Sequence, residues 1–139
     1  MSNTPWMDIA SAETGVKEIS GSKDTPRIVE YHRATSLKAT DDETPWCAAF
    51  VSWVLMKAGY ASKYSARARS YLDYGTPALK PQFGDIVIFS RGSAGHVAFY
   101  VGHDANGNIQ CLGGNQGNKV CVSTYDKERI LGFRRPYKV

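Results

Sequence analysis

The sequence lacks the features that mark several classes of protein. No apolar run approaches the about 20 residues that cross a bilayer, and the longest charge-free, apolar-rich run covers only residues 45–56. The N-terminus has no basic start of a secretory leader, and Asp8 interrupts its short apolar stretch. No internal repeat, low-complexity tract or linker is visible. We therefore expect one domain over residues 1–139, no membrane insertion, and a carrier other than its own N-terminus if it acts outside the cytoplasm.

Cysteines are few and odd in number: Cys47, Cys111 and Cys121. No C-x-x-C pair and no Cys/His set has the spacing of a zinc site, so we expect neither a metal nor a cofactor. Cys111 and Cys121 lie five residues to either side of Gln116, which would suit a disulfide across a hairpin. Two small apolar side chains within a sheet explain the pair equally simply.

Excess charge of one sign is also small, because 17 basic and 13 acidic residues leave a net charge of +4. Such an excess is compatible with an anionic cell wall, a lipid surface or nucleic acid. The basic residues are scattered, and their densest cluster, Arg129, Arg134, Arg135 and Lys138, is typical of a solvated terminal strand. We expect a monomer that does not bind nucleic acid.

The order of elements is helices first and strands later, which predicts an α+β domain. We expect helices over 5–15, from Thr25-Pro26 onward, over 45–58 and over 65–72, and strands over 86–89, 96–101, 109–112, 119–123 and 130–134. The helix over 45–58 is apolar on nearly every side, so it should be the buried central helix. The strands should form an antiparallel sheet of about five strands packed on that helix.

Cys47 lies at the start of this helix. If Thr44 is the N-cap and Pro45 is position N1, Cys47 is N3. Unpaired backbone N–H groups and the helix dipole there favour thiolate over thiol, so we expect a lowered pKa and a nucleophilic sulfur. Its own N–H group would help to hold an oxyanion. The alternative is a small buried hydrophobic residue, which most free cysteines are.

His96 follows Gly95 and opens a strand, at the rim of the expected sheet. With Cys47 it forms the nucleophile–base arrangement of a cysteine hydrolase. Asn115, between the next two strands, could accept a hydrogen bond from the ring and set its tautomer. A turn histidine and an Asn chosen for left-handed backbone geometry are the alternatives.

Several segments together resemble bacterial papain-fold cell-wall hydrolases, the NlpC-like peptidases and the CHAP (cysteine, histidine-dependent amidohydrolase/peptidase) domains. The segments are 27–31, 45–51, 84–87, 95–98, 112–116 and 131–136. The resemblance implies a papain-like fold with Cys47 as nucleophile and His96 as base. A third polar residue on the next strand matches Asn115, with Gln116 as the neighbouring candidate.

The resemblance also implies a function. The substrate would be the peptide of peptidoglycan, cut by an endopeptidase or an amidase, with Trp46, Gln116, Gly95 and Tyr31 near the substrate. Without a wall-binding module the chain resembles a single-domain phage endolysin or an antibacterial effector. It would act in the periplasm or cell wall, with a holin system or a cognate immunity protein as partner. A deamidating or transglutaminase-like toxin and a non-catalytic wall-binding module are the alternatives.

Overall fold

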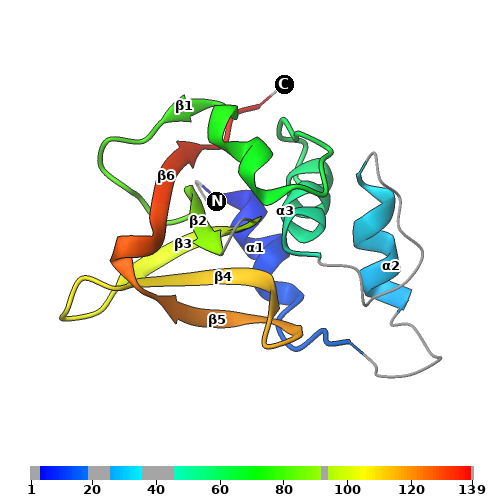
Figure 1. Ribbon diagram of the computed structural model, residues 1–139. Helices are drawn as coiled ribbons and strands as arrows, with labels where there is room; N and C mark the ends of the chain where they lie inside the picture. Colours follow the sequence, from blue (N-terminus) through cyan, green and yellow to red (C-terminus); the bar gives the residue numbers. More distant parts are fainter. Residues whose placement is uncertain (1–3, 19–25, 36–45, 92–93, 139) are drawn as a thin grey trace.

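The structure is a computed structural model that describes residues 4–18, 26–35, 46–91 and 94–138 (Figure 1). The helices are α1 (Pro5–Ala12), α2 (Pro26–Arg33) and α3 (Cys47–Lys57), with 3-10 helices η1 (Ala68–Asp73) and η2 (Lys127–Arg129). The strands are β1 (Thr76–Pro77), β2 (Ile86–Arg91), β3 (Ala94–His103), β4 (Ile109–Gln116), β5 (Lys119–Tyr125) and β6 (Ile130–Arg135). Within the described ranges, no helix is both long and apolar enough to cross a membrane.

The six strands form one antiparallel sheet in the order β1-β6-β2-β3-β4-β5. The predicted α+β architecture, with helices preceding an antiparallel sheet, is therefore confirmed. All five expected strands are present and are longer than the sequence indicated. The sixth strand, β1, is only a Thr-Pro pair beside β6, too short for any pattern in the sequence to mark it.

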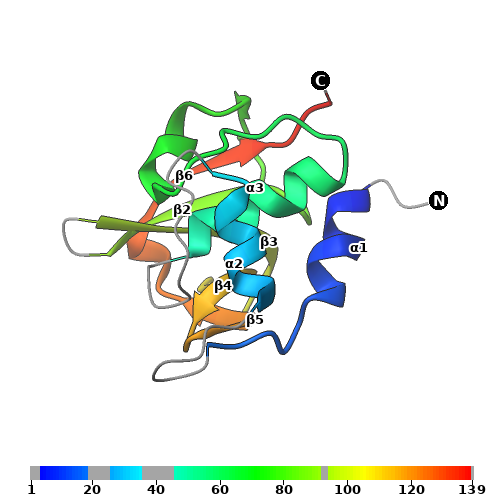
Figure 2. The same ribbon diagram turned by 90° about the vertical axis from the view of Figure 1, so that its right-hand side faces the viewer.

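Helix α3 is the central helix, as its all-round apolar sequence predicts, and every residue from Cys47 to Leu55 is buried. In Figures 1 and 2 it lies between the sheet and helix α2, with α1 alongside. Strand β4 approaches it very closely at Gly114. A Cβ there would lie 2.7 Å from Phe50 Cβ and 2.7 Å from the Trp46 ring. Only glycine lets this strand pack so tightly on the start of α3.

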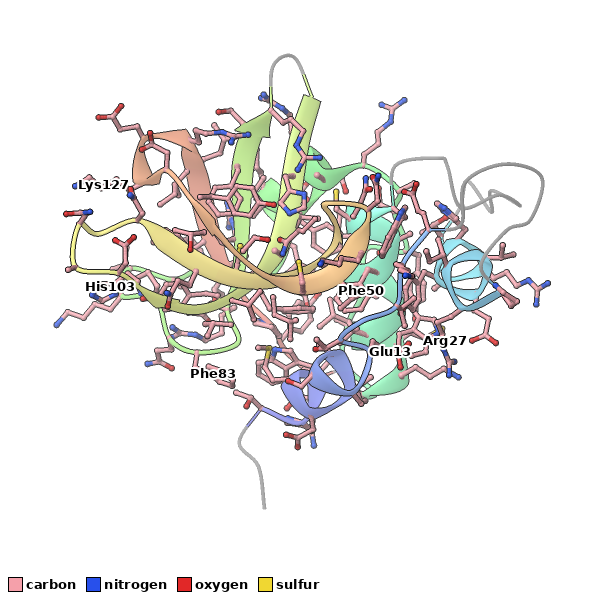
Figure 3. The ribbon with its side chains drawn as sticks, turned by 90° about the horizontal axis from the view of Figure 1, so that it is seen from below. Glu13, Arg27, Phe50, Phe83, His103 and Lys127 are labelled. Atoms are coloured by element: carbon pink, nitrogen blue, oxygen red, sulfur yellow. The ribbon has the colours of Figure 1, made fainter. Side chains whose placement is uncertain are left out.

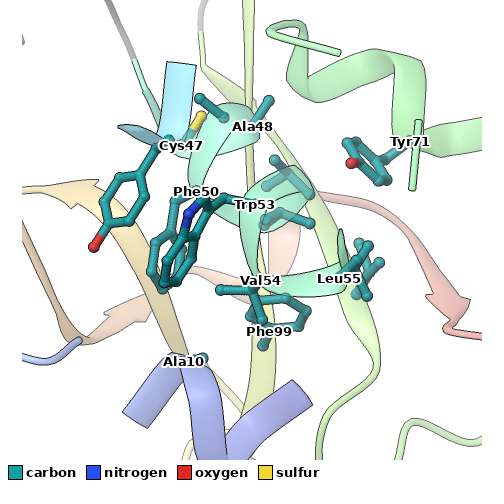
Figure 4. Packing of buried hydrophobic residues seen from close by; sticks show 14 of the residues in the cluster. Ala10, Cys47, Ala48, Phe50, Trp53, Val54, Leu55, Tyr71 and Phe99 are labelled. Atoms are coloured by element: carbon teal, nitrogen blue, oxygen red, sulfur yellow. The ribbon is translucent and has the colours of Figure 1, made fainter. Parts of the chain in front are cut away.

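Two apolar cores lie on opposite faces of the sheet. The larger one contains α3 and the helix-facing residues of the sheet, and Figure 4 shows Phe50, Val54 and Phe99 packed within it. The smaller one lies on the other face and contains alternate residues of the same strands, with partly buried neighbours: Val87, Phe89, Ala98, Tyr100, Ile109, Cys111, Tyr125, Ile130 and Phe133. Alternate strand residues therefore enter different cores.

Helix α2 is held by contacts with α1 and α3. Glu13, just after α1, forms an ion pair with Arg27 (3.1 Å) and accepts a hydrogen bond from the Tyr31 hydroxyl (2.7 Å); Figure 3 labels Glu13 and Arg27 side by side. The Tyr31 ring also packs against the rings of Trp46 and Phe50. The Trp46 N-cap of α3 therefore packs directly against α2.

Candidate active site

Cys47 is the first residue of helix α3, with Trp46 as the N-cap. The expected N-cap, Thr44, and the expected N1 residue, Pro45, lie outside the described residues. The expected position N3 for Cys47 is wrong by two residues, because Cys47 is N1. The first helical hydrogen bond runs from the Phe50 N–H to the Trp46 carbonyl, so the N–H groups of the first three helical residues are not used within the helix. Figure 4 shows the sulfur at this end of α3.

Burial is the strongest influence on the Cys47 thiol, and it raises the pKa above the ordinary value. The Val97 N–H, the Arg91 charge and nearby backbone N–H groups act in the opposite direction but do not outweigh it. The lowered pKa expected from the helix start is therefore wrong, because only 6% of the residue is exposed. The Val97 contact also places the sulfur beside the residue that follows His96.

The His96 ring is fully buried on β3, opposite Phe89. Burial lowers the pKa of His96 to about 4, and a hydrogen bond with Gln116 opposes this shift. The positive charges of Arg91 and Arg129 add to the lowering. The ring is therefore neutral at neutral pH. Its Nδ1 has no hydrogen-bond partner among the described residues.

Gln116 is the residue that orients this ring. Its Oε1 lies 2.9 Å from His96 Nε2, and its amide nitrogen donates to the carbonyls of Cys121 (2.6 Å) and Cys111 (3.3 Å). Because the amide nitrogen is held by two carbonyls, Oε1 must accept from an Nε2–H group. Gly113 leaves room for this arrangement, since a Cβ there would lie 2.6 Å from Oε1. The ring's lone pair is therefore on Nδ1.

Asn115 does not make the expected contact; the structure places Gln116 against the ring instead. Asn115 adopts a left-handed conformation with φ of 56°, as in the alternative turn role. The β4–β5 register pairs Gly113 with Cys121 and Gln116 with Lys119, so β4 has one extra residue. This bulge turns the Gln116 side chain onto the face that Gly113 occupies.

Tyr125 belongs to the site and was not expected from the sequence. Its hydroxyl lies 3.3 Å from His96 Nε2, and the two ring centroids are 5.1 Å apart. Burial raises the pKa of Tyr125 to about 12, so its hydroxyl is neutral. The residue lies 29 positions from His96, and no local pattern marked it.

The other expected substrate contacts divide into two groups. Trp46 and Tyr31 are fully buried, and the Trp46 Nε1–H donates to Glu18 (2.6 Å). Both therefore have core roles, and they present no surface to a peptide, which is a correction to the expected groove. Gly95 is half-buried opposite Ser90, directly before His96, and its contact with a substrate stays a prediction.

Cys111 and Cys121 are free thiols on neighbouring strands. Cys111 pairs with Ser123 and Cys121 with Gly113, so the cysteines are diagonal rather than directly opposed. The Gln116 side chain approaches both sulfurs, at 3.7 Å from Cys111 and 4.0 Å from Cys121. Across the described part of the chain, no group of three or more metal-ligating side chains exists.

Comparison with known proteins gives a family and a structural relative. The model of the CHAP domain matches residues 39–115, which include Cys47, His96 and Asn115. A crystal structure from Staphylococcus aureus, described as similar to a lipoprotein of the NLP/P60 family, shares the fold with a TM-score of 0.57 and 19% identity. The similarity covers 97% of this chain but only 42% of that one. No curated protein matches the chain.

The family match covers more than half of the sequence, and it includes the start of α3 with Cys47 and strand β3 with His96. The structural relative has the papain-like α+β fold. The chain belongs to the CHAP domain family, whose members are in general cysteine hydrolases that act on peptidoglycan.

Proposed function

We propose that this chain hydrolyses an amide bond in the peptide of peptidoglycan, with Cys47 as nucleophile and His96 as general base. The observation that carries the proposal is the state of His96: a buried, neutral ring whose Nε2–H is held by Gln116 and whose Nδ1 is unoccupied among the described residues. A buried polar atom without a partner is costly. A base that must receive a proton needs such an atom.

The chemistry begins from an uncharged pair, because burial disfavours both the thiolate and the imidazolium. The Cys47 S–H proton passes to His96 Nδ1 as the sulfur attacks the carbonyl carbon of the scissile amide. The amide nitrogen then takes that proton and leaves as an amine, which gives a thioester. Water activated by Nδ1 hydrolyses the thioester and restores the thiol.

Two parts of the site would stabilise the intermediates. Gln116 Oε1 accepts from Nε2–H throughout, so it supports the ring while it is positively charged. The N–H groups at the start of α3 are not used within the helix, and they can bind the negative oxygen of the tetrahedral intermediate. No step requires a metal or an organic cofactor.

The place of action and the partners are part of the same proposal. The substrate is the stem peptide, cut either within the peptide or at its sugar attachment, in the periplasm or cell wall of a bacterium. A phage endolysin that works with a holin system and an antibacterial effector with a cognate immunity protein both fit this activity.

The proposal is tested on purified sacculi, with mass spectrometry of the released fragments to name the bond. We expect Cys47→Ala to lower the rate by about 10³-fold or more without unfolding the protein. Cys121→Ala is the matched control, because Gln116 is held by the Cys121 backbone carbonyl, which the substitution keeps. Near-wild-type cleavage by Cys47→Ala would show that the mechanism is wrong.

A further inference from the structure

Two arginines beside the site have no acidic partner within the described ranges. Arg27 and Arg135 each form an ion pair with a carboxylate, whereas Arg91 and Arg129 form none with any described residue. Arg129 is instead fixed by Ser90, whose carbonyl accepts from its Nε–H (3.0 Å) and its Nη2–H (2.8 Å). No described residue accepts from its Nη1 donors, so its guanidinium group is held in place but is not neutralised there.

Arg129 is also linked to the base through Tyr125. The guanidinium carbon lies 5.7 Å from the centroid of the Tyr125 ring. The same ring lies against His96, and the Tyr125 hydroxyl is 3.3 Å from Nε2. The Tyr125 ring therefore lies between the Arg129 guanidinium group and the His96 ring, and the three groups form one continuous series of contacts with the fixed cation at its outer end.

Arg91 approaches from the neighbouring strand. It is the last residue of β2, two positions beyond Phe89, which pairs with His96, so its side chain starts on the same face of the sheet. The side chain is exposed, and its charge acts on both Cys47 and His96. Two cations thus border the reacting pair, and the described residues supply no anion to balance them.

We propose that Arg91 and Arg129 form a subsite for a carboxylate of the substrate, next to the amide bond that Cys47 attacks. This inference rests on the proposed function. A planar, fixed guanidinium suits the two oxygens of a carboxylate and discriminates against a neutral carboxamide. The preferred substrate is therefore a peptide with a free carboxylate near the scissile bond.

Binding that carboxylate would also assist the chemistry. Both arginines disfavour a positive charge on His96. A bound carboxylate offsets their charge, so the ring accepts the thiol proton more readily when the correct substrate is present. The subsite would then affect kcat as well as KM.

The test compares two forms of one substrate at fixed ionic strength. Peptide-bearing fragments released from sacculi by a muramidase are used as free acids and after their carboxylates have been converted to carboxamides. We expect the wild type to prefer the acid form by about tenfold or more in kcat/KM. Arg91→Gln and Arg129→Gln should each lower kcat/KM on the acid form by about tenfold. On the amide form they should cause no loss, because each removes a positive charge that disfavours protonation of His96.

Arg134→Gln is the matched control, because it removes the same charge opposite Ile86, at the other end of β2, roughly 16 Å away. It should change neither rate. Equal cleavage of both forms by the wild type, or equal losses on both forms in the arginine variants, would overturn the subsite and leave the hydrolase intact. Cleavage of neither form by the wild type would instead overturn the proposed function, and the subsite with it.

Discussion

The two ends of the sheet each bury an ionisable side chain, and the two side chains differ in how many of their polar atoms have hydrogen-bond partners. Asp85, just before β2, is 2% exposed, and its carboxylate accepts from Arg135 Nε–H (3.0 Å), Arg135 Nη2–H (2.9 Å) and the Gln82 N–H (2.7 Å). His96, at the other end, has one nitrogen bound and one unoccupied among the described residues. A carboxylate with all its hydrogen bonds made contributes to stability, whereas a buried nitrogen without a partner suits the proton transfer proposed for His96.

The two ends of the sheet also differ in the shape of their surface. A pocket of about 280 Å³ lies at the Asp85 end of the sheet, and neither Cys47 nor His96 lines it. Its lining residues are Thr4, Trp6, Tyr60, Gln82, Phe83, Asp85, Arg135 and Pro136. Its main polar groups are already engaged, since the Trp6 Nε1–H donates to the Gly84 carbonyl (2.8 Å) and Asp85 is held by Arg135. The presence of a pocket alone therefore does not identify the candidate active site.

The largest effect on the cleavage rate should come from removing the His96 ring, and with it Nδ1. His96→Ala is expected to lower the cleavage rate of sacculi by about 10³-fold, because the thiol then has no base. His103→Ala is the matched control: it removes a histidine at the other end of β3, whose ring Nδ1 forms a hydrogen bond with the Tyr100 hydroxyl (3.0 Å). A similar loss in both variants would mean that the two ends do not differ in this way.

The buried neutral ring should also make the protein sensitive to acid. The folded-state pKa of His96 is about 4, below the ordinary value near 6.5. This ring therefore costs no stability above about pH 6.5. Below that pH the unfolded chain binds a proton at His96 and the folded chain does not, so the free energy of unfolding decreases, by roughly 3 kcal/mol at about pH 4. Denaturant unfolding of the wild type and His96→Ala measures this.

The variant is expected to be less stable at neutral pH because of the cavity, but to lose less stability on acidification. Parallel decreases in the free energy of unfolding of the two proteins would show that the ring is not held neutral.

At the Asp85 end of the sheet, a substitution should affect stability rather than activity. Asp85→Ala removes three hydrogen bonds to a carboxylate and should lower the free energy of unfolding by about 2 kcal/mol, with the rate per folded molecule nearly unchanged. Asp73→Ala is the control, because its ion pair with Lys63 (2.7 Å) lies at the surface, and its unfolding midpoint should not move. A large loss of activity in folded Asp85→Ala would extend the reactive site to this end.

The smallest effect separates two neighbouring residues. Gln116→Ala should lower kcat by about tenfold, since the ring loses the acceptor that holds its tautomer. Asn115→Gly keeps the left-handed backbone and should leave kcat unchanged. The reverse result would return the orienting role to Asn115. Cleavage of a soluble peptide-bearing fragment gives both values.

Much of the fold followed from local patterns. A helix without a polar face must be buried, and α3 is. Alternating and apolar runs bounded by turns predicted the five longer strands. A Cys at a helix start and a His at a strand start predicted where these two side chains lie in the fold. The α1 and η1 ends differ from the expected ones because helix ends depend on tertiary contacts as well as on local sequence.

Two properties of the site, and one of the opposite end of the sheet, depended on tertiary structure. The bulge in β4 places Gln116, instead of Asn115, against the ring, and strand alternation in the sequence does not reveal one extra residue. Burial reverses the expected direction of the Cys47 pKa, because desolvation comes from the whole surrounding core rather than from the helix start. Asp85 and Arg135 meet across 50 residues. The sequence by itself determined which groups are proposed to react, Cys47 and His96; the packing determined their charge state and which neighbour contacts the ring, since both depend on atoms far away along the chain.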